Sequence, residues 1–396
     1  MLTENVIYEI KPLVRIEEPS EKSRGQYVMQ GSPVTKSLDI YHLIFAPTHA
    51  CNLRCKHCYL PDHATELIPK NIALRLVDEW SEIVMEERGA FGGIFHIKGG
   101  EPFVVPYFWN LIDRLAELQS LQLMITTNGT FVDEEIFERL ARCNEALDGH
   151  ATIVVSLDGA TEDTHSILRG PGQFARTLPF LEGIKSRGLT LHLNCVLHKG
   201  NVHELSAYIG LAKTYRASQV NFLSFVPRGI GFGFREFQLP HIEVYHEIDR
   251  LYSSGDKDTK ALLAGSLSHI KQRESTGQYR TSQECVAAYR GMYYVTPDGN
   301  VNTCPNIVYA DFAVGNVHKS TLKEIAANLP SLYNRLTRFS GPYLCSGERI
   351  LAEKNIDELN QVSLGILSNE LTVQTDEQNP SDCQLSELSY CYSRNY

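Results

Sequence analysis

The sequence predicts an α/β protein: a partial (β/α)6 barrel of the TIM type followed by a small C-terminal α+β domain. From about Tyr41, short apolar runs alternate with longer amphipathic ones. The short runs are continuously apolar, which is typical of parallel strands covered on both faces. Six strand–helix units fit an incomplete barrel better than a closed eight-stranded one. A doubly wound sheet remains the alternative, because periodicity does not distinguish the two.

Each predicted strand is one of the short apolar runs, taken in order along the chain. They are residues 43–48, 93–97, 121–126, 151–156, 189–196 and 219–225. The intervening segments have the spacing of amphipathic helices. These helical patterns lie around Trp80 and over residues 107–118, 133–143, 174–188 and 202–217. Gly89 and Gly188 follow two of the patterns and indicate helix ends.

The chain is expected to have five parts, because the strand–helix repetition ends before a cysteine-containing C-terminal third. They are an N-terminal extension (1–40), the barrel (41–255), a linker helix (256–284), the C-terminal domain (285–350) and a tail (351–396). The tail is polar up to Ser381, which indicates flexibility there.

Composition excludes several classes of protein. The formal net charge of −10 argues against general nucleic-acid binding, which needs a basic surface. The N-terminus lacks the features of a signal peptide, and no apolar run reaches the ~20 residues of a membrane span. We therefore expect a cytoplasmic protein that binds neither membrane nor nucleic acid. In a reducing compartment its ten cysteines favour ligands or buried thiols over disulfides, and Cys143 and Cys195 suit buried positions.

A distinctive short motif follows each predicted strand. In order these are the loop with Cys51, Cys55 and Cys58, then "GGEP" (99–102), "TNGT" (127–130), "LDGA" (157–160), "HKGN" (198–201) and "PRGIG" (227–231). Ligands of parallel α/β folds bind at the carboxyl ends of the strands. The six motifs therefore predict one ligand site.

The three clustered cysteines indicate a metal centre. Each iron of a 4Fe–4S cluster normally takes one cysteine, so three cysteines leave one iron open for another ligand. A zinc site is the alternative, with His49, His57 or His63 as a fourth ligand. A structural zinc would not need the five other motifs, which favours the cluster.

In these motifs the sequence resembles the radical S-adenosylmethionine (SAM) enzymes. The cysteine spacing and "GGEP" match the family pattern, and "SLDGATEDTHSILRGPGQFART" is similar to its peptide-modifying members. The resemblance implies that His57 contacts the adenine and that Arg169 pairs with the SAM carboxylate. It also implies the following contacts: the backbone of Gly99, Gly100 and Glu101 to the methionyl amine, Ser156 and Asp158 to the ribose or methionyl carboxylate, and Asn128 to the ribose side. Asn194 matches a position near SAM, or is a hydrogen-bonded polar residue at a strand end.

The C-terminal third resembles the start of a SPASM or "twitch" extension, which carries auxiliary iron–sulfur clusters. "YVTPDGNVNTC" predicts a hairpin that brings Cys304 near Cys285. The rest of the SPASM cysteine pattern is missing, and five cysteines cannot fully ligate two 4Fe–4S clusters. We therefore expect one auxiliary 4Fe–4S cluster, held by Cys285, Cys304, Cys345 and either Cys383 or Cys391. Two buried thiols on a hairpin, or tail cysteines without a metal, are the alternatives.

The resemblance implies an oxidoreductase that reductively cleaves SAM to a 5′-deoxyadenosyl radical. Its expected substrate is a ribosomally made precursor peptide, with carbon–carbon cross-linking of the cyclophane type as the expected reaction. Flavodoxin or ferredoxin is the expected electron donor. Thioether formation, epimerisation and formylglycine formation in sulfatases remain alternatives. So does a non-enzymatic iron–sulfur scaffold or electron-transfer protein. No residue pattern identifies a catalytic acid or base.

Overall fold

The computed structural model describes residues 41–88, 92–239, 241–264, 292–303 and 312–327, all within one compact unit, Leu38–Tyr396. Parallel strands form the centre of the fold, in the order β6-β5-β4-β3-β2-β1. Their bounds are β1 His42–Phe45, β2 Gly93–Ile97, β3 Leu121–Thr127, β4 Ala151–Ser156, β5 Thr190–Leu197 and β6 Gln219–Ser224. All six agree with the predicted strands to within a few residues.

The strand order decides between the two predicted architectures. Each strand from β1 to β6 lies beside the next one along the chain, and each pair is parallel. A doubly wound sheet reverses its order at a switch point. Right-handed crossovers with sequential order place every helix on the same face of the sheet. The partial barrel is therefore confirmed, and the doubly wound alternative is wrong.

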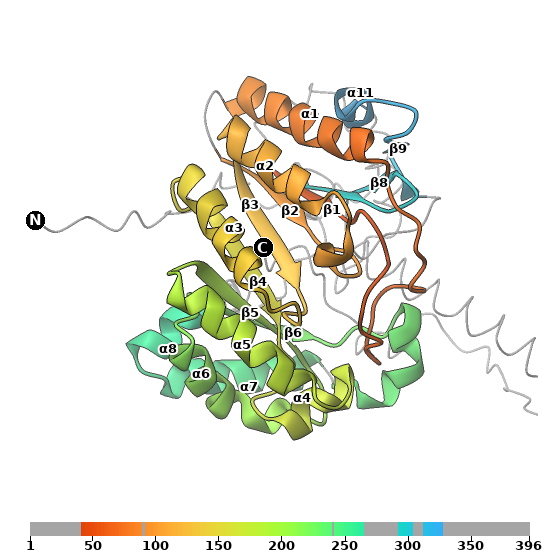
Figure 1. The fold of residues 1–396 in the computed structure, drawn as a ribbon. Helices are drawn as coiled ribbons and strands as arrows, with labels where there is room; N and C mark the ends of the chain where they lie inside the picture. Colours follow the sequence, from red (N-terminus) through yellow and green to blue (C-terminus); the bar gives the residue numbers. More distant parts are fainter. Residues whose placement is uncertain (1–40, 89–91, 240, 265–291, 304–311, 328–396) are drawn as a thin grey trace, which may run out of the picture. The chain divides into compact units, whose positions relative to one another are not determined.

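The helices run along one face of the sheet (Figure 1). Their bounds are α1 Lys70–Arg88, α2 Phe108–Leu118, α3 Glu134–Ala146, α4 Glu162–Arg169, α5 Gln173–Ser186, α6 Leu205–Thr214, α7 His241–Ser254 and α8 Lys257–Leu262. Helix α4 was not predicted as a helix. Its signals are Thr161, whose side chain caps the first turn, and the acidic Glu162 and Asp163 that follow.

The two faces of the sheet differ in chemistry because successive strand residues point to opposite sides. Leu43 and Phe45 of β1 belong to the main hydrophobic core beneath the helices. The opposite face holds buried polar groups. His42 Nε2 lies 3.2 Å from His96 Nδ1, and His96 Nε2 lies 2.7 Å from Thr126 Oγ1. Burial lowers the pKa of His42 to about 3, so this hydrogen-bonded chain is neutral.

The predicted hairpin is present, and its first strand joins the barrel sheet. Strand β7 (Met292–Val295) pairs antiparallel with β8 (Asn300–Asn302) and parallel with β1. Strand β9 (Gly315–Asn316) continues the sheet, and helix α11 (Leu322–Ala326) follows it. The C-terminal segment thus extends the edge of the barrel.

Several predicted parts fall outside the described residues. They are residues 1–40, Gly89, most of the linker helix 256–284 and the tail 351–396, together with Cys285, Cys304, Cys345, Cys383 and Cys391.

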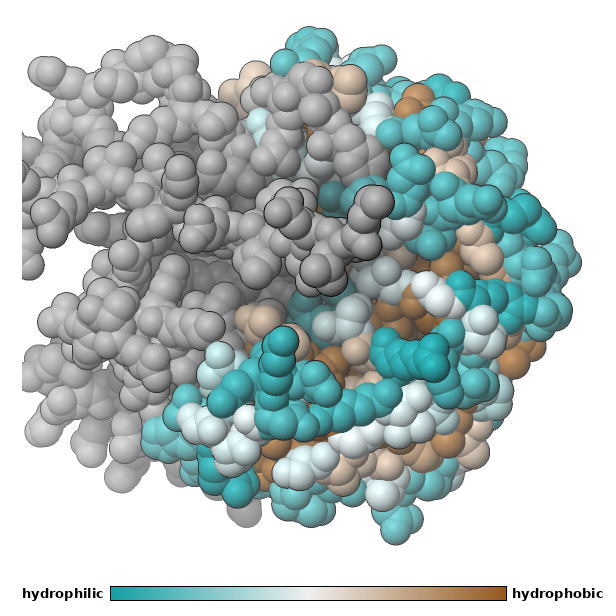
Figure 2. Space-filling view, turned by 90° about the vertical axis from the view of Figure 1, so that its left-hand side faces the viewer, coloured by the Kyte–Doolittle hydropathy of each residue, from teal (hydrophilic) through white to brown (hydrophobic). Residues whose placement is uncertain are grey.

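In the described part of the chain, no helix is long and apolar enough to span a bilayer. The coloured part of the face in Figure 2 is mostly hydrophilic, with small scattered groups of hydrophobic residues.

Two helical glycines offer a matched test of the packing between helices. A Cβ at Gly183 of α5 would lie 2.3 Å from the ring of the buried Phe137, whereas one at Gly210 of α6 would meet no atom within 4 Å. Alanine stabilises a helix by about 0.5–1 kcal/mol relative to glycine, and overpacking costs about 1–3 kcal/mol. We expect Gly210→Ala to raise the free energy of unfolding and Gly183→Ala to lower it. Urea unfolding measures the free energy of unfolding of each variant. Equal stabilisation by the two substitutions would contradict the close contact between Gly183 and Phe137.

Candidate active site

The carboxyl ends of the barrel strands and the cysteine loop surround a cavity of about 150 Å³. Most of the residues predicted to contact SAM line it. They are His57, Gly99, Gly100, Asn128, Ser156, Asp158, Arg169 and Asn194, together with the thiols of Cys51, Cys55 and Cys58. Glu101 is buried outside the lining. The structure therefore brings the predicted set together at one site, while the role of each residue remains a prediction.

Gly99 and Gly100 allow the end of β2 to touch the cysteine loop. Gly99 has a φ of +132°, and a Cβ there would lie 2.6 Å from the Thr48 carbonyl oxygen. A Cβ at Gly100 would lie 2.0 Å from the Ala50 carbonyl oxygen. The amides of Gly100 and Glu101 donate to these same two oxygens, at 3.0 and 2.9 Å. A methionyl amine donates hydrogen bonds, so it would pair with carbonyl oxygens of this motif and not with these amides.

The three thiols of the loop face the cavity and are partly exposed. Burial raises the pKa of each one, and that of Cys55 to about 11, although the positive charge of Arg169 opposes the shift. A bound metal removes the proton from such a thiol. Three thiols around one cavity suit a cluster whose irons each take one cysteine.

Two of the three histidines considered as a fourth zinc ligand contact carboxylates, and the third lies at the cavity. His49 Nδ1 lies 3.2 Å from Asp62, and His57 Nε2 lies 3.3 Å from Asp158. His63 lines the cavity. Among the described residues, no three His, Cys, Asp or Glu side chains converge as they would around a single metal ion.

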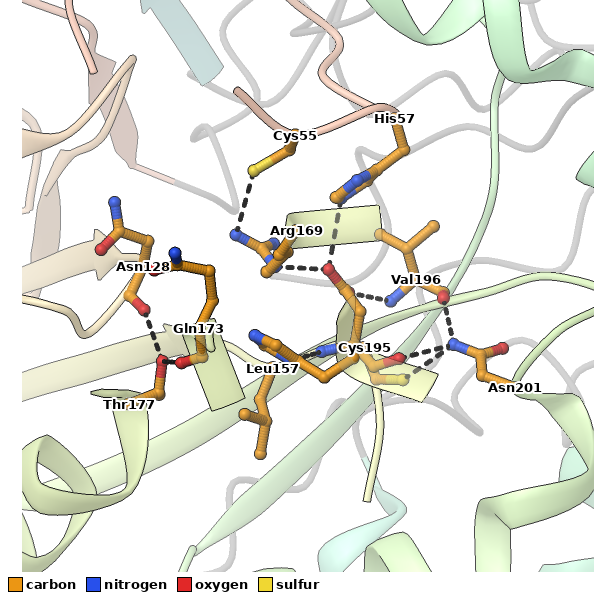
Figure 3. Close-up of polar contacts among 12 residues, drawn as sticks. Cys55, His57, Asn128, Leu157, Arg169, Gln173, Thr177, Cys195, Val196 and Asn201 are labelled. Carbon is orange, nitrogen blue, oxygen red and sulfur yellow. Dashed lines mark hydrogen bonds and ion pairs between the residues drawn. The ribbon is translucent and has the colours of Figure 1, made fainter. Parts of the chain in front are cut away.

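A fully buried carboxylate, Asp158, lies at the centre of the site. Arg169 Nε donates to its Oδ2 at 2.5 Å, and the Val196 amide donates to its Oδ1 at 2.8 Å (Figure 3). Burial alone would raise the pKa of Asp158, but the charge of Arg169 and the nearby His57 hold it at about 2. Burial lowers the pKa of His57 to about 4. Asp158 is therefore ionised, Arg169 is its counter-ion, and His57 is neutral.

Glu101 ties the ends of β2 and β3 together. Its carboxylate accepts hydrogen bonds from Thr127 Oγ1 at 2.8 Å, the Asn128 amide at 2.8 Å and the Phe103 amide at 3.3 Å. Burial raises its pKa to about 7 despite these bonds. The side chain thus supports Asn128 from behind the cavity.

The amides at the cavity wall are held by other side chains. Asn128 Nδ2 donates to Asn52 in the cysteine loop at 2.8 Å. Asn194 lines the cavity and also accepts a hydrogen bond from Asn221 at 2.8 Å. Both interpretations of Asn194 therefore have support, since it is hydrogen-bonded and also faces the site.

The motifs after β5 and β6 act mainly as supports. Asn201 of "HKGN" donates to the Asp158 carbonyl at 2.9 Å, and neither Asn201 nor His198 lines the cavity. Gly231 of "PRGIG" donates to the Cys58 carbonyl at 2.8 Å, and a Cβ there would lie 2.8 Å from the His57 carbonyl oxygen. Both motifs thus brace neighbouring loops.

Sequence reasoning missed Lys98 and Tyr59, which line the cavity together with Arg228 of the predicted motif "PRGIG". The Nζ of Lys98 lies 5.1 Å from the Tyr59 ring centroid, and the Arg228 guanidinium lies 4.9 Å from it. Tyr59 Oη lies 3.2 Å from Tyr294 Oη on β7. The available signals were that Tyr59 directly follows Cys58 and that Lys98 directly precedes "GGEP".

Two family descriptions match the chain. The radical SAM superfamily matches residues 45–209, and an iron–sulfur cluster-binding domain, SPASM, matches residues 285–347. The chain is a radical SAM enzyme. Its cofactors are a 4Fe–4S cluster with SAM and an auxiliary iron–sulfur cluster in the SPASM region. Cys285, Cys304 and Cys345 lie within the SPASM match, whereas Cys383 and Cys391 lie beyond it.

Several curated relatives of this radical SAM enzyme are similar to it over part of their length. The mycofactocin maturase MftC of Mycobacterium ulcerans is 29% identical over 68% of this chain and 69% of its own. The AdoMet-dependent heme synthase of Methanosarcina barkeri is 27% identical over 71% of this chain and 80% of its own. The PqqA peptide cyclase of Granulibacter bethesdensis is 32% identical over 50% of each chain.

Solved structures share the fold of this radical SAM enzyme. Streptococcus suis SuiB bound to S-adenosylmethionine has a TM-score of 0.57 at 16% identity, over 73% of this chain and 65% of that one. The anSMEcpe structure with AdoMet and the Cp18Cys peptide has a TM-score of 0.56 at 19% identity, over 72% and 80%. At these identities the likeness shows the fold alone.

The raised pKa of Glu101 predicts a pH dependence of stability. A carboxyl whose folded pKa lies above its ordinary value stabilises the fold fully below pH 4.5, and this contribution is lost as pH rises towards about 7. The difference between the folded pKa of Glu101 and its ordinary pKa corresponds to about 3 kcal/mol. Relative to Glu101→Gln, the natural protein should lose up to this much free energy of unfolding between pH 4.5 and 8. Urea unfolding measures the free energy of unfolding of both proteins across this range. If the value for the natural protein minus that for Glu101→Gln stays constant or rises with pH, the prediction is contradicted.

Proposed function

We propose that this radical SAM enzyme oxidatively cross-links side chains in a ribosomally made precursor peptide. The observation that carries the proposal is the single cavity that gathers the three thiols with the predicted SAM-contacting residues. Two comparisons support a peptide substrate. One relative is named a PqqA peptide cyclase, and anSMEcpe has been solved with a peptide bound.

The residues of the cavity suit radical chemistry. When bound, the cluster and SAM would supply the radical chemistry that activates a substrate carbon. Cys51, Cys55 and Cys58 would hold the cluster, and the buried Asp158–Arg169 pair would help to hold SAM. Part of the lining is apolar, which keeps water from the reacting carbon. These side chains are Leu53, Leu60, Val196, Leu223, Phe225 and Val226.

For the bond formed, we propose a carbon–carbon link of the cyclophane type. It rests on the likeness of the "LDGATEDTHSILRG" segment to peptide-modifying members and on the ring closure named in the peptide cyclase. The missing SPASM cysteines count against formylglycine formation. Thioether formation and epimerisation would use the same cavity and are outcomes of the test below. We further propose flavodoxin or ferredoxin as the electron donor and the cytoplasm as the location.

Cleavage of SAM should depend on the cluster thiols. The reconstituted full-length protein should produce 5′-deoxyadenosine from SAM and dithionite under anaerobic conditions. Cys55→Ala should lower the rate by more than 100-fold, because it removes an iron ligand. Cys143→Ala is the matched control and should retain the rate, since this thiol is buried in the hydrophobic core. Chromatography of 5′-deoxyadenosine gives the rates. If the reconstituted protein forms no 5′-deoxyadenosine, that result would support the electron-transfer alternative.

We expect the neighbouring open reading frame to encode a short precursor peptide that carries the modification. After co-expression with the enzyme, mass spectrometry should show the loss of two hydrogens that does not require a substrate thiol, with fragments placing the link at an aromatic ring. The Cys55→Ala enzyme should leave the peptide unchanged. A thiol-dependent loss would indicate a thioether, and an unchanged mass with altered chirality would indicate epimerisation. An unmodified peptide alongside active SAM cleavage would contradict a peptide substrate.

A further inference from the structure

Arg169 contacts both a buried carboxylate and a cysteine of the metal-binding loop. It is the last residue of α4, and its side chain is 10% exposed. Nε donates to Asp158 Oδ2 at 2.5 Å, while Nη1 lies 3.9 Å from Cys55 Sγ, within the range of a hydrogen bond to sulfur (Figure 3). The planar guanidinium can make these two contacts at once, because its donors point in fixed, diverging directions.

The distance between Arg169 and Cys55 is fixed from both sides. The Lys56 amide, next to Cys55, donates to the carbonyl of Leu168 at 2.8 Å, so the backbones of the loop and α4 are joined beside the two side chains. Asp158 is in turn held by the Val196 amide and lies 3.3 Å from His57 Nε2. Arg169 therefore cannot turn away from Cys55 without breaking a buried ion pair.

A fixed cation beside a ligating sulfur has a redox consequence. The reduced form of an iron–sulfur cluster carries one more negative charge than the oxidised form. Hydrogen bonds to the sulfurs stabilise that charge and raise the reduction potential. The effect is strong in a buried site, where water screens little.

We propose that Arg169 sets the reduction potential of the cluster held by Cys51, Cys55 and Cys58. It does so by donating to the Cys55 sulfur from a position that Asp158 fixes. This role adds to the predicted pairing of Arg169 with the SAM carboxylate and operates when SAM is absent. It concerns the cluster alone and does not depend on the identity of the substrate.

The test is a redox titration of the reconstituted full-length protein without SAM, followed by electron paramagnetic resonance. The auxiliary signal is identified in a variant with Cys51, Cys55 and Cys58 replaced by Ala, and subtracted. The ratio of reduced to oxidised cluster is compared at the potential where this cluster is half reduced in the natural protein. There, Arg169→Gln should lower the ratio at least tenfold, which corresponds to a fall of about 59 mV in the midpoint potential for one electron. Arg54→Gln is the matched control. Arg54 lies in the same loop and is exposed, but donates to the carbonyls of Cys51 and Leu53 rather than to a sulfur, so the ratio should change less than twofold.

A ratio for Arg169→Gln within twofold of the natural protein overturns the proposal, as does an equal shift in Arg54→Gln. If Arg169→Gln fails to hold the cluster, Arg169→Lys decides. Its ammonium keeps the charge but lacks the planar fork through which Nε and Nη1 make the two contacts, so at least a threefold fall in the ratio supports the proposal. A ratio equal to that of the natural protein overturns it.

Discussion

The active site depends on one ion pair in the protein interior, Asp158 with Arg169. A carboxylate with no exposed surface is stable only when a cation and hydrogen-bond donors replace its water. Those partners come from different elements: Arg169 from α4, Val196 from β5 and His57 from the cysteine loop. Removing one member of such a pair typically costs about 3–5 kcal/mol, because the other charge is left unpaired. Because the buried Asp158 needs these partners, its contacts hold the three separate segments in place around the cavity.

The cysteine loop has little regular structure of its own and takes its shape from its neighbours. The end of β2 supplies glycines that its backbone approaches closely, and the segment after β6 donates to the carbonyls of Leu60 and Cys58. Rigid strand ends thereby position a loop of thiols, as is common for functional loops on parallel α/β folds. The spacing of the three cysteines predicted a metal centre, whereas their mutual arrangement comes from contacts with residues far away in the sequence.

Much of the fold could be predicted because buried parallel strands leave a clear apolar pattern. The predicted strand ends showed where the six motifs would lie. Ten of the residues predicted to contact SAM or the metal, together with Asn194, line one cavity. The six strand–helix units favoured the sequential strand order of a partial barrel, but periodicity alone could not exclude the order of a doubly wound sheet. The ion pair of Arg169 with Asp158 and the position of Lys98 beside Tyr59 also escaped prediction, because they depend on tertiary distances. Helix α4 was missed because it is short, with 8 residues, and polar on average, although Thr161 caps its first turn.

The pairing of β7 with β1 has a consequence for biosynthesis. Strand β1 leads directly into the cysteine loop, and one of its edges is completed by residues 292–295, with the Ala46 amide donating to the Val295 carbonyl at 2.9 Å. Until these residues leave the ribosome, the nascent barrel carries an open strand edge, which is the kind of edge that pairs with other chains. The strand that leads into the cysteine loop therefore gains its second neighbour only after most of the chain has been synthesised.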